Sequence, residues 1–425
     1  MTGPRGIAPL QRPVDAVIRP PGSKSQTIRA LLAAALAEGR SRLDRPLESD
    51  DTAFARRALG QLGVGIETAQ EQWVVEGTAG TLQPAPGPID VGASGLTARA
   101  MIAVASLVSG TTTVVGRDRL PERPMGGLVE ALRGLGVEAV DTGGRLPVTV
   151  VGTGGLPGGT VEVASDQTTQ FATALLIAAP LAQGPLHIVP IGLEGSHRYL
   201  DLTIETMRRF GARVDRTDSG YQGFPTGYTS VELEIEPDAS AAVYPMIAAA
   251  ISGGRVTIDG LGSRSIQPDM DVAGVLATMG CDLEQNDTAT TVDARGRRLQ
   301  PIDVDLSGSP DGSLAVAVAA LFASGPSRLR GLGSLRFKES DRLSALATEI
   351  TRLGAGARVE GTELVITPAA MRPARIETYG DHRMAMSFAL VGLGVPGLEI
   401  ADPEVVAKTW PGFWDMLDRL SEPNP

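Results

Sequence analysis

The chain has 425 residues and a formal net charge of −11, with 38 Lys and Arg against 49 Asp and Glu. This acidic balance argues against a dedicated nucleic-acid-binding protein, which normally carries a basic excess. A single cysteine excludes an internal disulfide and a multi-cysteine metal site, and three scattered histidines argue against a histidine-based zinc centre.

The first residues, MTGPRGIAPLQRPV, lack the apolar stretch of a secretory signal. No apolar run reaches the length that a membrane span needs, and runs such as Leu314–Ala323 suit buried helices. We therefore expect a cytoplasmic protein with no membrane partner. A chain of this length and hydrophobicity is expected to form two or three domains.

Six apolar, alanine-rich segments follow along the chain, and each ends in a glycine and a strand-like run. They span residues 23–43, 94–114, 168–188, 238–258, 311–330 and 381–400, and their closing glycines lie 69–74 residues apart. Glycine commonly follows the last turn of a helix. A helix that is apolar on every side is buried on every side. Each segment therefore predicts a core helix followed by a strand.

An amphipathic helix alternates with these core helices. Its copies end at Gly63, Gly136, Gly211, Gly280 and Gly354, and residues 414–420 fit a sixth. The chain thus contains six copies of one unit of about 70 residues, each with a core helix, an amphipathic helix and short strands. Six such units exceed one hydrophobic core, so we expect an α/β protein with two domains of three units each.

The starts of the core helices carry polar residues. They read Ser23-Lys24-Ser25, Ser94-Gly95, Thr168-Thr169-Gln170, Asp238-Ala239-Ser240, Asp311-Gly312-Ser313 and Asp381-His382-Arg383. N-capping explains Asp238 and Ser240, but it does not explain Lys24 or Arg383. Helix N-termini that meet by pseudo-symmetry present N–H groups and positive dipole ends to an anion. We expect two such surfaces, one in each domain, to face an interdomain cleft and a multiply anionic substrate.

Only three of the 38 basic residues are lysines: Lys24, Lys338 and Lys408. They lie in PGSKSQTIR, LRFKESDRL and VAKTWPGFW, which are crowded with other polar or turn residues. Lysine, unlike arginine, readily shifts its pKa and moves a proton. The sequence therefore predicts a cationic cleft in an acidic protein, with Asp and Glu as proton carriers. Such a cleft is typical of an enzyme that acts on small phosphorylated or carboxylated substrates.

Six strings resemble the 5-enolpyruvylshikimate-3-phosphate synthase family, in family order from Pro20 to Trp414. They are PGSKSQTIRALLAAAL, ERPMGGLVEAL, QFATALLIAAP, LRFKESDRL, GDHRMAMSFAL and VAKTWPGFW. The resemblance implies a two-domain inverted α/β barrel of six βαβαββ repeats, three in each domain. It implies a discontinuous lobe, residues 1–20 plus 236–425, in which the N-terminal strand completes one repeat, and a second lobe, residues 21–235.

The family moves the enolpyruvyl group of phosphoenolpyruvate onto the 5-hydroxyl of shikimate 3-phosphate, a step of aromatic amino-acid biosynthesis. The reaction releases phosphate by addition and elimination through a tetrahedral intermediate. The resemblance therefore implies a transferase with these two small-molecule substrates, no metal, no organic cofactor and no nucleic-acid partner. It also implies a monomer.

The family motifs assign residues to both substrates. The implied shikimate 3-phosphate site is Lys24, Ser25, Arg29, Thr168, Thr169, Gln170, Ser196, Tyr199, Asp311, Ser334 and Lys338. The implied phosphoenolpyruvate site is Lys24, Gly95, Arg123, Gln170, Arg342, His382, Arg383 and Lys408. Asp311 is implied to accept the proton of the attacking hydroxyl, and Glu339 to exchange a proton with the methylene carbon. Lys24 is a rival proton donor, and the division of roles among these three catalytic residues stays open.

Residues 92–99, GASGLTAR, depart from the family pattern Asn-Ala-Gly-Thr-Ala-Met-Arg. Ala93 replaces an amide and Leu96 replaces a hydroxyl beside Gly95. In the family this segment borders the phosphoenolpyruvate pocket. We therefore expect a reshaped pocket wall that weakens glyphosate, a herbicidal mimic of phosphoenolpyruvate, more than it weakens the substrate.

Three other functions compete with this interpretation. The sister enolpyruvyl transferase that acts on UDP-N-acetylglucosamine uses a reactive cysteine in a mobile loop, whereas Cys281 follows an amphipathic helix and is predicted to pack. A noncatalytic phosphometabolite-binding protein would not need both Asp311 and Glu339 in a site for anions. An RNA-processing role conflicts with the net charge of −11.

Overall fold

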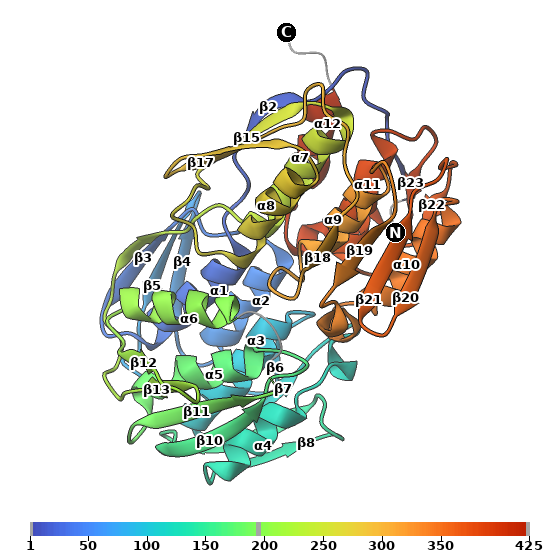
Figure 1. The fold of residues 1–425 in the computed structure, drawn as a ribbon. Coiled ribbons are helices and arrows are strands. Elements are labelled where there is room, and N and C mark those ends of the chain that lie inside the picture. The colour runs from blue at the N-terminus through green and yellow to red at the C-terminus, as the bar shows by residue number, and fades with distance from the viewer. Residues whose placement is uncertain (1–2, 193–196, 422–425) are drawn as a thin grey trace. The chain divides into compact units, whose positions relative to one another are not determined.

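The computed structural model describes residues 3–192 and 197–421. The chain divides into two compact units, and Figure 1 colours it from blue to red along the sequence. Unit 1 contains Met1–Pro21 and Glu236–Pro425, and unit 2 contains Gly22–Ile235. The chain therefore begins in unit 1, builds all of unit 2, and then returns to unit 1.

Unit 2 contains three four-stranded sheets within the described residues, in the orders β14-β3-β5-β4, β6-β7-β9-β8 and β10-β11-β13-β12. The strands are β3 (Arg40–Asp44), β4 (Gly65–Ala69), β5 (Gln72–Glu76), β6 (Ile89–Asp90), β7 (Ser109–Val115), β8 (Glu138–Asp141), β9 (Val148–Thr153), β10 (Gly159–Ala164), β11 (Leu186–Ile191), β12 (Val214–Arg216), β13 (Tyr221–Gly223) and β14 (Glu232–Glu234). The helices are α1 (Lys24–Leu36), α2 (Asp50–Gly60), α3 (Gly95–Val104), α4 (Gly126–Gly134), α5 (Gln170–Ala178) and α6 (Arg198–Arg209), with short 3₁₀ turns η1 (Ala105–Leu107), η2 (Leu120–Glu122) and η3 (Ala179–Leu181).

One connection pattern builds every sheet of unit 2. In the second repeat, β6 runs parallel to β7, which is antiparallel to β9, and β9 closes a hairpin with β8. A parallel pair needs a crossover connection, and α3 supplies it between β6 and β7. The repeat is therefore βαβαββ. The first repeat takes its leading strand, β14, from the far end of the unit, where it pairs parallel with β3.

Unit 1 repeats the pattern with sheets β16-β17-β15-β2, β18-β19-β21-β20 and β1-β23-β22. The strands are β1 (Arg5–Gly6), β2 (Asp15–Ile18), β15 (Arg255–Asp259), β16 (Asp282–Gln285), β17 (Ala289–Asp293), β18 (Asp303–Asp305), β19 (Ser327–Arg330), β20 (Gly356–Glu360), β21 (Glu363–Thr367), β22 (Arg375–Ile376) and β23 (Glu399–Ile400). The helices are α7 (Ala239–Ser252), α8 (Asp271–Thr278), α9 (Ser313–Ala320), α10 (Arg342–Arg352), α11 (His382–Gly392) and α12 (Phe413–Ser421), with 3₁₀ turns η4 (Pro268–Met270), η5 (Gly333–Phe337) and η6 (Pro403–Lys408).

The N-terminal residues contribute strands to unit 1. Strand β2, blue in Figure 1, lies parallel to the yellow β15, and β1 pairs antiparallel with β23. The N-terminal residues therefore add one strand to each of two sheets, whereas the family resemblance implies a single N-terminal strand that completes one repeat. With these strands in place, each unit contains three repeats, and the third sheet of unit 1 has three strands where the other five sheets of the described residues have four. The α/β fold of six repeats is confirmed.

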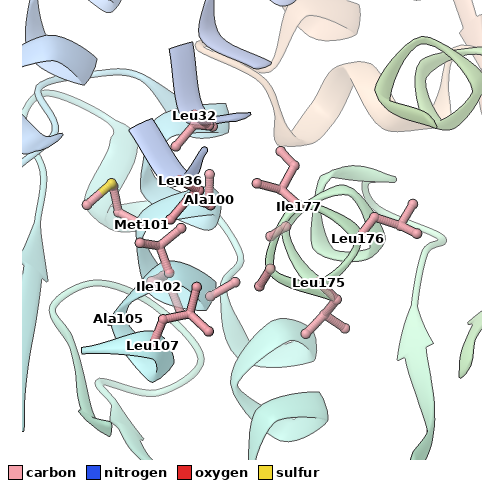
Figure 2. Packing of buried hydrophobic residues seen from close by; sticks show 14 of the residues in the cluster. Leu32, Leu36, Ala100, Met101, Ile102, Ala105, Leu107, Leu175, Leu176 and Ile177 are labelled. Atoms are coloured by element: carbon pink, nitrogen blue, oxygen red, sulfur yellow. The ribbon is translucent and has the colours of Figure 1, made fainter. Parts of the chain in front are cut away.

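The alanine-rich helices form the core of each unit, as their composition predicts. Every residue of α3 and of α9 is buried. Figure 2 shows side chains of α1, α3 and α5 facing one another in unit 2, with Leu36, Ala100 and Ile177 among them. The amphipathic helices bury one face only. The polar starts of the core helices are therefore held by a rigid, close-packed scaffold.

No helix in residues 3–192 and 197–421 combines the length and the hydropathy of a membrane span. Cys281 belongs to the apolar core of unit 1 and is 6% exposed. Burial raises the pKa of its thiol to about 11, so the reactive thiolate is disfavoured. The structure thus confirms that Cys281 is a packing residue.

Candidate functional site

Arg29 lies on the second turn of α1 and is 3% exposed. Its Nε donates to Thr203 Oγ1 at 2.8 Å, and Nη1 donates to the carbonyl of Ser25 at 3.0 Å. Nη2 donates to the carbonyl of Tyr199 at 3.4 Å, which connects α1 to the start of α6. Burial lowers the pKa of the Arg29 guanidinium to about 10. A bound anion would therefore stabilise a cation that the fold holds at a cost.

Lys24 is the first residue of α1, immediately after the N-cap Ser23. Its Nζ lies 3.5 Å from Asp51 Oδ2, and the two side chains are 14% and 5% exposed. Asp51 belongs to the first turn of α2. No sequence motif points to this buried carboxylate, which pairs with Lys24 at the start of the core helix α1.

Arg99 is a second unassigned residue. It is 1% exposed within α3, and its Nη1 donates to Gln170 Oε1 at 2.6 Å. Its Nη2 donates to the carbonyl of Pro124 at 2.9 Å. Arg99 thereby ties the start of α5 to the segment that carries Arg123. A signal was present in the sequence, because Arg99 is the one charged residue in the apolar run 94–114.

Gly95 and Arg123 are in close contact. Gly95 is the first residue of α3, and a Cβ added there would lie 2.7 Å from Nη1 and 2.9 Å from Cζ of Arg123. Arg123 is 6% exposed. The guanidinium therefore lies against the backbone of the helix N-terminus, where only glycine leaves room for it. The sequence motifs predict that both residues bind phosphoenolpyruvate, and the structure places them in contact with each other.

We expect Gly95→Ala to displace the Arg123 guanidinium, because the new methyl group would occupy its place. The KM for the anionic substrate of this site should rise about 10-fold or more, with a smaller change in kcat, as a lost binding contact predicts. Steady-state kinetics measure both parameters. Gly134→Ala is the matched control, since the nearest atom to its Cβ lies 3.9 Å away. An unchanged KM in Gly95→Ala would contradict the role of this contact.

Two further predicted residues of unit 2, Thr168 and Thr169, lie at the start of α5. Thr168 Oγ1 accepts from the backbone N–H of Gln170 at 3.2 Å, and Thr169 is the N-cap residue. Thr173 and Thr203 place their hydroxyls 3.3 Å apart, which joins α5 to α6. Ser25 lies in the first turn of α1 and is half-buried. Ser196 lies outside the described residues.

Arg342 is the hub of the predicted site in unit 1. It begins α10, is 1% exposed, and makes ion pairs with carboxylates from three segments. Its Nε lies 2.8 Å from Asp381 Oδ2, Nη1 lies 2.9 Å from Asp311 Oδ1, and Nη2 lies 2.9 Å from Glu339 Oε2. Burial alone would lower the pKa of Arg342, but the charges of Asp381, Glu339 and Asp311 outweigh it and raise the pKa above its ordinary value.

Asp311 lies just before α9 and is surrounded by cations. In addition to Arg342, its carboxylate contacts Arg383 Nη2 at 3.1 Å and Lys338 Nζ at 3.6 Å. Its side chain is 19% exposed, so it is accessible to a substrate. Asp311 and Glu339 thus share one buried guanidinium, that of Arg342.

His382 and Arg383 open α11 and are buried. Asp381 caps this helix by accepting from the backbone N–H of Arg383 at 2.9 Å. The preceding turn has two residues with left-handed backbone, Tyr379 (φ 56°) and Gly380 (φ 66°). The hydroxyl of Tyr379 donates to the buried Glu349 Oε1 at 2.7 Å. This hydrogen bond to Glu349 of α10 therefore fixes the strained turn and, with it, the orientation of the first residues of α11.

The other predicted residues of unit 1 lie on or directly after short 3₁₀ turns. Ser334 belongs to η5, and Lys338 follows it directly. Lys408 ends η6 and is 8% exposed. Buried lysines of this kind are costly unless an anion or a dipole stabilises them.

One local interpretation is wrong. N-capping explains Asp238, whose carboxylate accepts from the backbone N–H groups of Ser240 and Ala241. It does not explain the hydroxyl of Ser240, which donates instead to the buried Asp269 on η4. A contact across 29 residues decides the role of this serine, and the local spacing could not reveal it.

The described residues contain no group of three or more His, Cys, Asp or Glu side chains that could hold a metal ion. The predicted site residues include several positively charged side chains: Lys24, Arg29 and Arg123 in unit 2, and Arg342 and Arg383 in unit 1. Each unit adds hydroxyls or carboxylates beside its cations. Such groups bind phosphate and carboxylate and exchange protons.

The profile of one family, EPSP synthase (3-phosphoshikimate 1-carboxyvinyltransferase), matches residues 10–417. A 3-phosphoshikimate 1-carboxyvinyltransferase of Methanoculleus marisnigri is 40% identical over 413 residues, which cover 95% of this chain and 96% of that protein. One of Shewanella piezotolerans is 39% identical over 427 residues, with 98% and 99% covered. A solved EPSP synthase structure from Acinetobacter baumannii has a TM-score of 0.82 at 25% identity, with 99% of this chain and 98% of that chain covered.

Proposed function

The chain belongs to the EPSP synthase family, and we propose that it transfers the enolpyruvyl group of phosphoenolpyruvate to the 5-hydroxyl of shikimate 3-phosphate. One observation in particular supports this proposal. The buried guanidinium of Arg342 holds Asp311 and Glu339 at 2.9 Å each. A reaction that removes one proton from oxygen and exchanges another at carbon can use two such carboxylates.

The two substrates are polyanions, and the family motifs assign basic and polar residues and one glycine to them. The residues assigned to shikimate 3-phosphate are Arg29, Ser25, Thr168, Thr169, Tyr199, Ser196, Asp311, Ser334 and Lys338. Gly95, Arg123, Arg342, His382, Arg383 and Lys408 are assigned to phosphoenolpyruvate, and Lys24 and Gln170 to both. Arginine forks match carboxylate and phosphate oxygens in pairs, whereas lysine supplies a point charge.

The chemistry then proceeds in two balanced steps. Asp311 accepts the proton of the 5-hydroxyl while that oxygen bonds to C2 of phosphoenolpyruvate and C3 gains a proton to become a methyl group. Elimination removes one methyl proton, restores the C2–C3 double bond and expels phosphate from C2. Glu339 exchanges the proton at C3, and Lys24 is the alternative donor.

The first experiment is phosphate release by the purified chain with phosphoenolpyruvate and a second substrate. Release with shikimate 3-phosphate, and none with UDP-N-acetylglucosamine, is the expected result. Release with the nucleotide sugar alone would identify the sister transferase, although the buried Cys281 argues against it. Release with neither would favour a noncatalytic phosphometabolite-binding protein.

We expect weak inhibition by glyphosate relative to the binding of phosphoenolpyruvate. Leu96 stands where the family has a hydroxyl, and its side chain is 7% exposed within the core of unit 2. Leu96 directly follows Gly95, against which the Arg123 guanidinium packs. We therefore expect the larger side chain of Leu96 to change the pocket wall beside Arg123. The ratio of the glyphosate Ki to the phosphoenolpyruvate KM measures the effect.

Leu96→Thr restores the hydroxyl and should lower this ratio. Leu107→Thr, at a buried position beyond the end of α3, is the matched control for lost apolar volume. A ratio below one in the wild-type enzyme, or no change in Leu96→Thr, would contradict the prediction.

A further inference from the structure

Asp269 is a buried carboxylate that the proposed reaction does not use. It lies on η4 between β15 and α8 and is 1% exposed. No sequence motif assigns a role to it. A carboxylate buried to this degree is costly unless hydrogen bonds and charges compensate it. The burial of the Asp269 carboxylate therefore has to be compensated by the groups around it.

Asp269 connects the starts of two core helices. Its Oδ1 accepts from the backbone N–H of Gly312 at 3.1 Å, and its Oδ2 accepts from the hydroxyl of Ser240 in α7. The Gly312 N–H belongs to the peptide that follows Asp311. The neighbouring carbonyl of Pro268 accepts from Ser309 Oγ at 2.8 Å, so the 309–312 segment is fixed to η4 at both ends.

Gly312 permits this close approach. A Cβ at that position would lie 3.3 Å from Asp269 Oδ1 and 2.7 Å from Cγ2 of Val272. The absence of a side chain thus lets the Asp269 carboxylate reach the backbone directly beneath Asp311. The hydrogen bond sets the orientation of the 311–312 peptide and, through it, the direction of the Asp311 side chain.

We propose that Asp269 is a positioning residue for Asp311, which it orients through the Gly312 N–H and whose basicity it sustains with its own negative charge. The inference rests on the proposed function, in which Asp311 accepts the proton of the attacking hydroxyl. Removal of the charge should weaken Asp311 as a base and leave substrate binding in place.

Several charged groups face Asp269. They are Asp311 at the start of α9, Arg383 on α11 and Asp238 at the start of α7, and the neutral hydroxyl of Ser240 adds a hydrogen bond. Burial, followed by the charge of Asp311, raises the pKa of Asp269 to about 6, whereas Arg383 and Ser240 oppose the shift. Asp269 is therefore ionised at neutral pH and becomes protonated near pH 6. Its protonation removes the charge beside Asp311, so kcat should fall below this pH.

The test is Asp269→Asn, which keeps an oxygen acceptor for the Gly312 N–H and removes the charge. We expect kcat to fall by about 10- to 100-fold, as for a misdirected general base, with the KM for phosphoenolpyruvate and the Kd for shikimate 3-phosphate within about twofold of wild type. The ionisation near pH 6 in the kcat profile of the wild type should be absent from the variant.

Thermal stability separates positioning from a structural role. The fold raises the pKa of Asp269, so its contribution to stability is complete below the pKa of an unfolded aspartate and is lost as the pH rises through about 6. Asparagine cannot ionise. The Tm of Asp269→Asn at pH 7.5 should therefore equal or exceed that of the wild type, although its activity is lower.

Asp271→Asn is the matched control, since it removes an exposed carboxylate from the first turn of α8. It should retain wild-type kcat and the ionisation near pH 6. Wild-type kcat in Asp269→Asn, persistence of the ionisation, or a joint loss of kcat, binding and Tm would each overturn this inference alone. A wild-type enzyme that releases no phosphate from the two substrates would overturn the proposed function and this inference with it.

Discussion

Asp311→Asn is expected to lower kcat by about 10²- to 10⁴-fold, the range that a general base contributes. The substitution preserves the size of the side chain and removes its ability to accept a proton. Shikimate 3-phosphate should still bind, because the cations around Asp311 are retained and lose a competing carboxylate. Single-turnover kinetics and equilibrium binding measure the two effects separately.

Asp303→Asn is the control for this variant, since Asp303 is an exposed residue of β18 that pairs with Arg330. It should leave kcat unchanged. A noncatalytic binding protein predicts the opposite pattern for Asp311→Asn: no turnover to lose, and equal or tighter binding. Retention of wild-type kcat would show that another group, such as Lys24 or Glu339, accepts the proton.

The repeat architecture is predictable from sequence because it depends on local patterns of apolar residues and glycines. An alanine-rich segment such as 311–330 has no polar face, so its helix has to be buried, and α9 is buried at every residue. The closing glycines mark the ends of the helices, and their regular spacing gives the number of repeats. The same patterns place Lys24, Gln170 and Arg383 at helix starts, where the structure finds them.

The partners of these residues are not predictable in this way. Arg99 reaches Gln170 across 71 positions, and Arg342 reaches Asp381 across 39. Such contacts depend on which helix starts the barrel brings together, and no periodicity in the chain encodes that. Ser240 illustrates the difficulty, because a serine at this position is a good cap by local rules, yet its hydroxyl binds Asp269 from another segment.

Arg342→Met is expected to destabilise the fold by about 3–5 kcal/mol, the cost of breaking a buried ion pair from one side. Methionine fills a similar volume, but it leaves Asp381, which is 0% exposed, without its guanidinium partner. Asp311 and Glu339 lose the same cation. Urea unfolding followed by circular dichroism measures the change as a lower midpoint at an unchanged slope. Arg330→Met, which breaks the exposed pair with Asp303, should cost less than about 1 kcal/mol.

The double variant Arg342→Met/Asp381→Asn tests the cause of the loss. If the unpaired charge of Asp381 is responsible, its replacement by a neutral amide should restore part of the stability, with a coupling on the order of 1–3 kcal/mol. The amide can still accept from the Arg383 N–H and so preserve the cap of α11. Strict additivity of the two substitutions would instead assign the loss to packing around Arg342. In that case Arg342 would stabilise unit 1 chiefly through its volume, and the carboxylates would hold their positions without it.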